Sequence, residues 1–201
     1  MILFIFFLAF LLVVGAALWW RGRTRLEQQQ NASPPSASER SFFTLEIGDI
    51  VQNGLRDWVV ESIYIYNQDD FEWVEYLLRD SEDLVWLSVV EDDWLEISWM
   101  KPVPPEDLSI SMPLRDSILF DGVRYQREDR GLARYRTSGR VRNQKGYCQF
   151  HDYKGPDQRC LSVEIYGTEF DQGDLELCVG ERIRPEQLTL LAGDGRSVYG
   201  S

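Results

Sequence analysis

Turn-forming residues recur along most of this chain about every eight to twelve residues, and they separate short runs rich in β-branched and aromatic side chains. This spacing is typical of an all-β domain. Asp121-Gly122 also has the composition of a two-residue hairpin turn. The predicted strands cover residues 45–51, 57–66, 72–78, 84–90 and 95–100 in the first half, and 117–120, 123–126, 132–137, 146–153, 160–166 and 175–179 in the second.

The two halves of this predicted domain share a short pattern. Trp86-Leu87-Ser88-Val89 recurs 74 positions later as Cys160-Leu161-Ser162-Val163, and strands of similar spacing flank both segments. We therefore expect a mainly β fold, an antiparallel domain built from two related β units that are small sheets or open barrels. The units would cover residues 41–116 and 117–192, and residues 193–201 would form a C-terminal tail.

The N-terminal residues 1–20 contain no charged or strongly polar side chain. A helix of about twenty residues reaches the roughly 30 Å of a bilayer core, and Trp19 and Trp20 stand where interfacial aromatic residues belong. The pattern predicts a transmembrane helix. A cleaved secretory signal is the alternative, but no Lys or Arg precedes the apolar run and the run is long for such a signal.

Basic residues follow the apolar run directly, namely Arg21, Arg23 and Arg25. By the positive-inside rule they predict a single-pass membrane protein with its N-terminus outside and the bulk of the chain in the cytoplasm. Residues 21–40 are rich in Gln, Ser, Ala and Pro and poor in bulky apolar side chains, so this stretch is expected to be a basic stop followed by a flexible linker.

The charge of the chain is uneven. Residues 41–120 contain 18 acidic and 4 basic residues, whereas residues 124–145 contain eight basic residues and only two acidic ones. A formal net charge of −12 would repel a polyanion, so we expect no nucleic-acid partner. The basic stretch is expected to offset the acidic half within the domain, or to contact anionic lipid.

Candidate metal ligands are few. They are Cys148, His151, Cys160 and Cys178. An odd number of cysteines does not describe a disulfide framework and fits a reducing compartment. Positions 148 and 151 would point to opposite faces of a strand, which argues against a shared zinc ion. The sequence shows no nucleophile elbow or glycine-rich phosphate loop, so we expect neither a cofactor nor catalytic activity.

Several segments resemble a bacterial family, the domain of unknown function 4178, and particularly its cyanobacterial-type members. The segments are Gly48-Asp49-Ile50-Val51, Trp73-Val74-Glu75-Tyr76-Leu77-Leu78, Trp86-Leu87-Ser88-Val89 and Leu161-Ser162-Val163-Glu164. The resemblance covers most of residues 45–191. It implies a domain without an established activity, found beside membrane and envelope-stress proteins or polyamine enzymes, and it supplies no catalytic residues.

The sequence favours a membrane-anchored interaction or scaffolding domain that meets a protein partner at the bilayer. An acidic turn with neighbouring tryptophans is the candidate contact surface, made of Glu91, Asp92, Asp93, Trp94 and Trp99. The alternative is a binder or sensor of a small cation such as a polyamine, because carboxylates and aromatic faces together suit an ammonium group.

Overall fold

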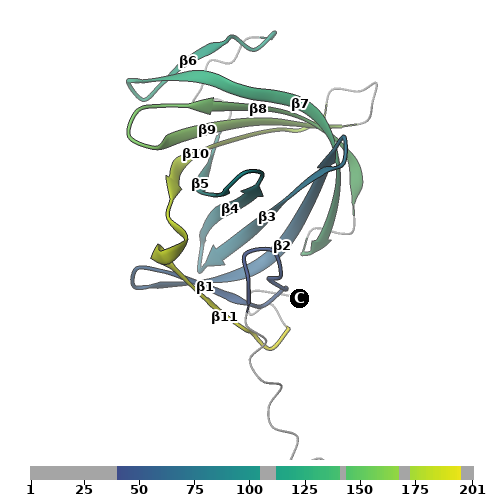
Figure 1. Ribbon diagram of the computed structural model, residues 1–201, viewed down its shortest axis with the longest axis vertical. Helices are drawn as coiled ribbons and strands as arrows, with labels where there is room; N and C mark the ends of the chain where they lie inside the picture. The colour runs from purple at the N-terminus through teal and green to yellow at the C-terminus, as the bar shows by residue number, and fades with distance from the viewer. Residues whose placement is uncertain (1–39, 105–111, 141–143, 168–172, 196–201) are drawn as a thin grey trace, which may run out of the picture. The chain divides into compact units, whose positions relative to one another are not determined.

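Eleven antiparallel strands and one short 3₁₀ helix make up the part of the chain that the computed structural model describes, residues 40–104, 112–140, 144–167 and 173–195 (Figure 1). The elements are β1 (Ile50–Asn53), β2 (Arg56–Gln68), β3 (Phe71–Asp80), β4 (Asp83–Glu91), β5 (Leu95–Val103), β6 (Ser117–Phe120), β7 (Val123–Gly139), β8 (Lys145–Lys154), β9 (Arg159–Gly167), β10 (Leu175–Ile183), η2 (Pro185–Gln187) and β11 (Leu188–Leu191). The mainly β, antiparallel prediction is confirmed.

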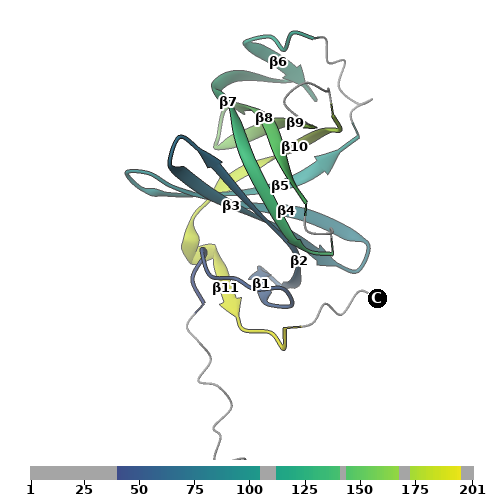
Figure 2. The ribbon, with the colours of Figure 1, turned by 90° about the vertical axis from the view of Figure 1, so that its right-hand side faces the viewer.

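All eleven strands belong to one sheet, in the order β11-β1-β2-β3-β4-β5-β10-β9-β8-β7-β6. An additional pairing of β2 with β7 closes eight of these strands, β2–β5 and β7–β10, into a ring (Figures 1 and 2). Strands from both predicted units therefore share one hydrogen-bonded sheet.

The ring closes because β2 changes its neighbour partway along. Its first residues pair with β1, and after a bulge between Val60 and Ser62 the strand pairs with β7. Bulges bend a strand and increase its twist, which a closed sheet requires. At the junction Gly139 has φ +104°, and a Cβ there would lie 2.4 Å from the backbone oxygen of Glu61. Only glycine fits this approach.

The hairpin predicted at Asp121-Gly122 joins β6 to β7, and both residues have the positive φ values that such a turn needs. The two strands predicted at residues 123–126 and 132–137 are one continuous strand, β7, with a bulge between Arg127 and Asp129. On β7 the charged residues between the two predicted strands pair with β8. Residues 45–49, predicted as strand, precede β1.

Apolar side chains cover the outside of the ring in two places. Tyr76 and Leu87 lie in a cluster that β1 and β11 cover, and Tyr153 and Leu161 lie in a cluster beneath β6. Alternate residues of the same strands point inward, because successive side chains on a strand face opposite sides. The inner residues therefore include both aromatic and acidic side chains.

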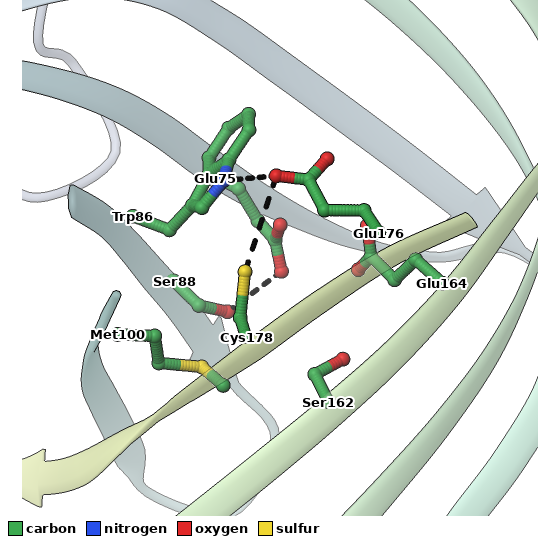
Figure 3. A pocket seen from close by; sticks show the side chains of 8 residues that line it. All are labelled: Glu75, Trp86, Ser88, Met100, Ser162, Glu164, Glu176 and Cys178. Atoms are coloured by element: carbon green, nitrogen blue, oxygen red, sulfur yellow. Dashed lines mark hydrogen bonds between the residues drawn. The ribbon is translucent and has the colours of Figure 1, made fainter. Parts of the chain in front are cut away.

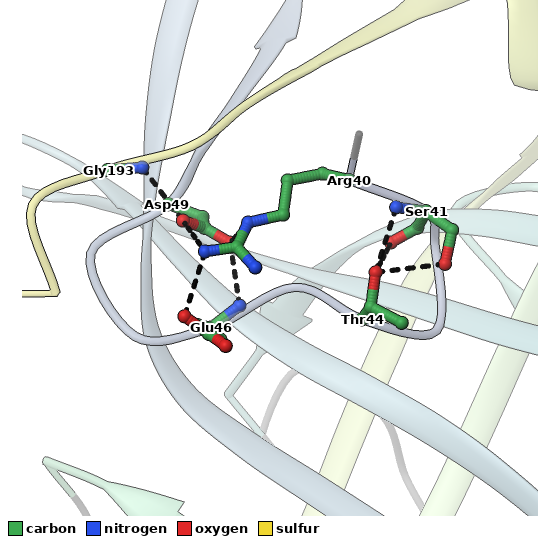
Figure 4. Close-up of polar contacts among 6 residues, drawn as sticks. All are labelled: Arg40, Ser41, Thr44, Glu46, Asp49 and Gly193. Atoms are coloured by element: carbon green, nitrogen blue, oxygen red, sulfur yellow. Dashed lines mark hydrogen bonds and ion pairs between the residues drawn. The ribbon is translucent and has the colours of Figure 1, made fainter. Parts of the chain in front are cut away.

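The carboxylate of Asp49, which forms a buried ion pair with Arg40, connects the segment before β1 with the segment after β11 (Figure 4). The Nε of Arg40 lies 2.8 Å from Oδ2 of Asp49, whose side chain is only 1% exposed. The same carboxylate accepts backbone N–H groups of Glu46, at 2.7 Å, and Gly193, at 2.8 Å. Asp49 thus joins residues that are far apart in the sequence.

No helix among the described residues has the length and apolar character needed to cross a membrane. The predicted anchor at residues 1–20 lies outside the described residues, together with its markers Trp19, Trp20, Arg21, Arg23 and Arg25. The linker predicted at residues 21–40 also lies outside them, except for Arg40.

Candidate functional site

The closed ring encloses a cavity of about 590 Å³ that is lined mainly by inward-pointing residues of its strands. Its acidic lining residues are Asp69, Glu75, Asp92, Glu96, Glu128, Asp129, Asp152 and Glu164, and Arg182 is the basic residue that lines it with them. Apolar wall is supplied by Phe71, Trp73, Val90, Met100 and Phe150, among others. The cavity is therefore strongly acidic, with an aromatic and aliphatic wall.

At its inner end the cavity adjoins a smaller void of about 20 Å³, where three glutamates meet (Figure 3). Glu164 on β9 and Glu176 on β10 are direct cross-strand partners, and Glu75 comes from β3. Like charges directly opposite each other on a sheet are destabilising. No Lys, Arg or His among the described residues lines this void, so no basic side chain there offsets the three carboxyls.

Neutral donors hold the three carboxyl groups in place. Ser88 Oγ donates to Glu75 at 2.9 Å, and the indole N–H of Trp86 donates to Glu176. Glu164 accepts hydrogen bonds from Tyr166 and, at 3.3 Å, from Tyr66. These bonds orient the carboxyl groups but bring no positive charge to them.

Burial raises the pKa of all three glutamates. Desolvation is the largest cause in each case, and it raises the pKa of Glu75 to about 8 and that of Glu164 well above its ordinary value. Repulsion between Glu164 and its two acidic neighbours adds to the shift of its pKa. Glu75 therefore holds its proton at neutral pH, and burial favours the protonated form of Glu164 and Glu176 as well.

A second acidic pair lines the larger cavity but not the small void. Asp129 on β7 and Asp152 on β8 are cross-strand partners, as are Asp152 and Ser162. Burial raises the pKa of Asp152 to about 6, and the charge of Asp129 contributes to this, while a hydrogen bond from Ser162 opposes it. As at the inner end, two acidic residues here stand directly opposite each other on adjacent strands.

Arg182 is already engaged at the mouth. Its Nε lies 3.1 Å from Glu96, and its Nη2 contacts Glu128. Lys154 lies 3.6 Å from the same Glu128. The two glutamates at the mouth, Glu96 and Glu128, therefore have basic partners in Arg182 and Lys154.

Aromatic rings form part of the inner wall. Tyr66 stacks on Trp73 with ring centroids 5.0 Å apart, and Trp73 meets Phe150 edge to face at 5.3 Å. Tyr66 also shares a 2.6 Å hydrogen bond with Tyr166. Such faces suit both an alkyl chain and the positive charge of an ammonium group.

The predicted contact residues do not form one patch. Glu91 ends β4, and Asp92, Asp93 and Trp94 lie exposed in the turn to β5, where Asp92 lines the cavity. The indole of Trp94 is 67% exposed and donates to Glu96 at 2.9 Å.

Trp99 lies elsewhere. It is half-buried on the outer side of β5 and packs edge to face on Trp58, with centroids 5.4 Å apart. The turn that contains Trp94 therefore belongs to the mouth of the cavity, whereas Trp99 belongs to the outer packing.

The sequence prediction missed the inward-pointing acids Glu75, Asp152, Glu164 and Glu176, of which Glu164 is buried and the others are partly buried. A usable signal was present, because Glu75, Glu164 and Glu176 each stand between two apolar residues within a strand. A lone acid at an alternating position of an apolar strand indicates that the opposite face of the sheet is partly polar.

The three cysteines are free and buried. Cys148, Cys160 and Cys178 point into the ring, whereas His151 lies buried on the other face of β8. Within the described ranges, no group of His, Cys, Asp and Glu side chains has the arrangement needed to hold a metal ion.

Comparison with known proteins gave one match. Residues 46–185 match the model of a protein family described as a domain of unknown function (DUF4178). Neither a curated protein nor a solved structure matches the chain. The matched residues begin before β1 and end at Pro185, so they include every strand of the closed ring. The chain therefore belongs to the DUF4178 family.

Proposed function

We propose that this domain is a non-catalytic binding protein that takes up a small organic cation inside its closed sheet. The observation that carries the proposal is the direct opposition of Glu164 and Glu176, with Glu75 beside them and no basic side chain lining the void that they share. A bound cation would stabilise the ionised form of these carboxyl groups, and the adjoining cavity of about 590 Å³ lies within the usual size range of small-molecule sites.

An ammonium group fits this lining better than a metal ion. A metal needs several ligands converging on one point, and the described residues form no such group. An ammonium group instead donates separate hydrogen bonds, which scattered carboxylates such as Glu75 and Glu164 can accept. The rings of Trp73 and Phe150 would contact the apolar part of the ligand.

Binding would be linked to proton release. Because the pKa of Glu75 is about 8 in the empty cavity, this carboxyl group holds its proton at neutral pH. A cation favours the ionised form, so its entry would expel the proton. Affinity would then rise as the pH increases toward 8, as long as the ligand amine stays protonated.

Calorimetry of the full-length chain with spermidine tests the proposal, in a neutral detergent because residues 1–20 are apolar. We expect saturable binding at pH 8, with a heat that varies with the ionisation enthalpy of the buffer because protons are released. Diols and dicarboxylates of similar length serve as neutral and anionic controls. Absence of binding by spermidine and by simpler amines would refute the proposal.

A variant pair locates the site. Glu164→Gln keeps the shape of an inner residue and removes its charge, so we expect about a tenfold or greater loss of affinity. Glu181→Gln makes the same change at an exposed position of β10 and should leave the affinity unchanged. Equal effects of the two substitutions would place binding on the outer surface.

We propose as well that the two halves derive from one duplicated β unit. The order β1 to β5 is repeated by β6 to β10, each beginning with a short strand hairpin-paired to a long one. Glu75 with Ser88 and Asp152 with Ser162 occupy corresponding positions of the two series. The repeat supports this reading because both pairs have the same cross-strand relation.

A second functional proposal concerns the location of the protein in the cell. The apolar residues 1–20 with the following Arg21, Arg23 and Arg25 support a single membrane anchor, a cytoplasmic domain and a protein partner at the bilayer. Membrane fractionation tests the anchor, since the full-length chain should sediment with membranes and a chain lacking residues 2–20 should not. Crosslinking from native membranes tests the partner, which should be captured by the full-length chain and lost with Asp92→Ala or Asp93→Ala.

A further inference from the structure

We propose that the ligand is an elongated dication, two ammonium groups joined by an alkyl chain, which spans two acidic subsites at different depths in the cavity. This inference rests on the proposed function and adds the class of cation. The inner subsite is formed by Glu75, Glu164 and Glu176, and the outer subsite by Asp129 and Asp152.

The inner subsite has room for one cationic end. Glu164 and Glu176 face each other on adjacent strands, and the void that they share with Glu75 is only about 20 Å³. A void of that size holds little more than one water molecule or one ammonium group. Glu75 and Glu164 also line the larger cavity, so this end of the ligand would be reached from the mouth.

The outer subsite is a neighbouring pair, in which Asp129 is exposed. The charge of Asp152 helps to raise the pKa of Glu75 and Glu164. Asp152 is the cross-strand partner of both Asp129 on β7 and Ser162 on β9. Ser162 precedes Glu164 by two residues on β9, and two residues of an antiparallel strand span about 7 Å. Along the strand direction the two subsites are therefore about 7 Å apart, which is the length of a short alkyl chain.

The wall beside the two subsites is apolar. Phe150 is the cross-strand partner of Glu164, and it precedes Asp152 by two residues on the same inner face of β8. Trp73, Val90 and Met100 line the cavity from the β3–β5 side. Methylene groups between two ammonium ends would be buried against these side chains.

The remaining acids have other surroundings. Glu96 and Glu128 contact Arg182, and Glu128 also lies 3.6 Å from Lys154. Asp69 and Asp92 lie in exposed turns, where water screens their charge. Among the described residues, the ion pairs at the mouth involve Glu96 and Glu128 and none of the acids of the two subsites, while the charge of Arg182 lowers the pKa of Asp152.

A series of α,ω-diaminoalkanes, from diaminopropane to diaminooctane, tests the inference by calorimetry on the full-length chain in neutral detergent at pH 8. The alkylamine of equal chain length is the control for each diamine. We expect an optimum chain length at which the diamine binds at least tenfold tighter than its monoamine. The gain at that length corresponds to the second charged contact.

Two variants test which subsite binds each ammonium end of the ligand. Asp152→Asn removes charge from the outer subsite and Glu176→Gln from the inner one, and either should reduce the diamine advantage over the monoamine to less than about threefold. Glu181→Gln, exposed on the same strand as Glu176, should keep the full advantage.

The outcomes separate the two proposals. Monoamines that bind as tightly as diamines at every length would overturn the two-subsite inference and leave a cation site standing. Binding of no amine at all would overturn both. A third outcome is that diamines bind with an optimum chain length while neither Asp152→Asn nor Glu176→Gln weakens their binding. That result would overturn the assignment of these subsites.

Discussion

Glu164 and Glu176 are cross-strand partners on β9 and β10, and both carboxyl groups point into the closed sheet (Figure 3). Each accepts hydrogen bonds from neutral donors, Tyr166 and Trp86 respectively. Burial raises the pKa of both groups, which favours their protonated forms, and no basic side chain among the described residues lines the void that they share. Ionisation of these groups as the pH rises therefore lowers the stability of the folded protein.

Neutralising one member of this pair should stabilise the empty protein at alkaline pH. For Glu176→Gln we expect a free energy of unfolding higher than that of the unchanged protein by on the order of 1 kcal/mol at pH 9, where ionised carboxyls repel each other across the strands. At pH 4 both proteins should be about equally stable, because the carboxyl group is then largely protonated in the folded and the unfolded state. Urea unfolding at the two pH values measures the difference, and a gain of the same size at both would contradict the explanation.

The stability of the empty protein should fall as the pH rises through the neutral range. The pKa of Glu75 is raised from its ordinary value to about 8 and that of Asp152 to about 6. Between the ordinary and the raised values the folded chain binds more protons than the unfolded chain, so the free energy of unfolding decreases with pH. Below the ordinary values this dependence disappears, and above about 8 the loss is complete.

Glu75→Gln should flatten that profile. The amide keeps an acceptor for Ser88 but cannot ionise, so we expect a stability gain on the order of a few kcal/mol at pH 8.5 and none at pH 4. Thermal unfolding across the pH range measures both profiles. If the two curves stay parallel, Glu75 does not titrate in the folded protein as its burial requires.

Asp49→Ala should destabilise the fold strongly. It removes the acceptor for two backbone N–H groups and leaves Arg40 without its buried partner, so we expect a loss of about 2–4 kcal/mol. Asp93→Ala, an exposed change in the β4–β5 turn, is the control and should cost less than about 0.5 kcal/mol. Chemical denaturation compares the variants, and similar losses would show that the ion pair contributes little.

The two tryptophans of the predicted contact surface should differ in their effect on stability. Trp99→Ala removes the edge-to-face contact with Trp58, so we expect a cost of about 2–3 kcal/mol. Trp94→Ala removes an indole that is 67% exposed and should cost less than about 1 kcal/mol. Denaturant midpoints report the difference, and a larger cost at Trp94 would reverse the assignment.

The cysteine thiols should be nearly unreactive in the folded protein. Burial raises the pKa of Cys160 to about 11 and also raises the pKa of Cys148 and Cys178. With Ellman's reagent at pH 8 we expect slow reaction of the native protein and rapid reaction of all three thiols in urea. Cys160 lines the larger cavity, so it should react first, and bound spermidine should slow it. Fast native labelling that Cys160→Ser leaves unchanged would contradict this.

Local patterns were enough to predict most of the strands. The spacing of turn residues located ten of the eleven strands, all but β11, at least in part, and Asp121-Gly122 marked its hairpin correctly. Alternation of side chains on β8 also placed Cys148 and His151 on opposite faces, as the spacing of three residues predicted. These features depend on the conformational preferences of residues that are close together in the sequence.

Long-range pairing was outside the reach of such patterns. The continuity of β7 through its charged middle depends on partners in β8, and the closure of the ring depends on Gly139 meeting Ser62 in β2. Nothing in either segment alone specifies the other as its partner. The prediction of two strands in place of β7 was wrong for this reason.

The sequence by itself determined which side chains share a face of each strand, and so it placed Glu75, Glu164 and Glu176 on particular faces. Only the tertiary structure decided that these faces point into one enclosed cavity and that Glu164 stands opposite Glu176. The physical reason is that alternation along a strand is a local property, set by the pleat of the backbone. Which face becomes the inside depends on register and closure among strands up to about a hundred residues apart, because only the folded sheet removes water from one side.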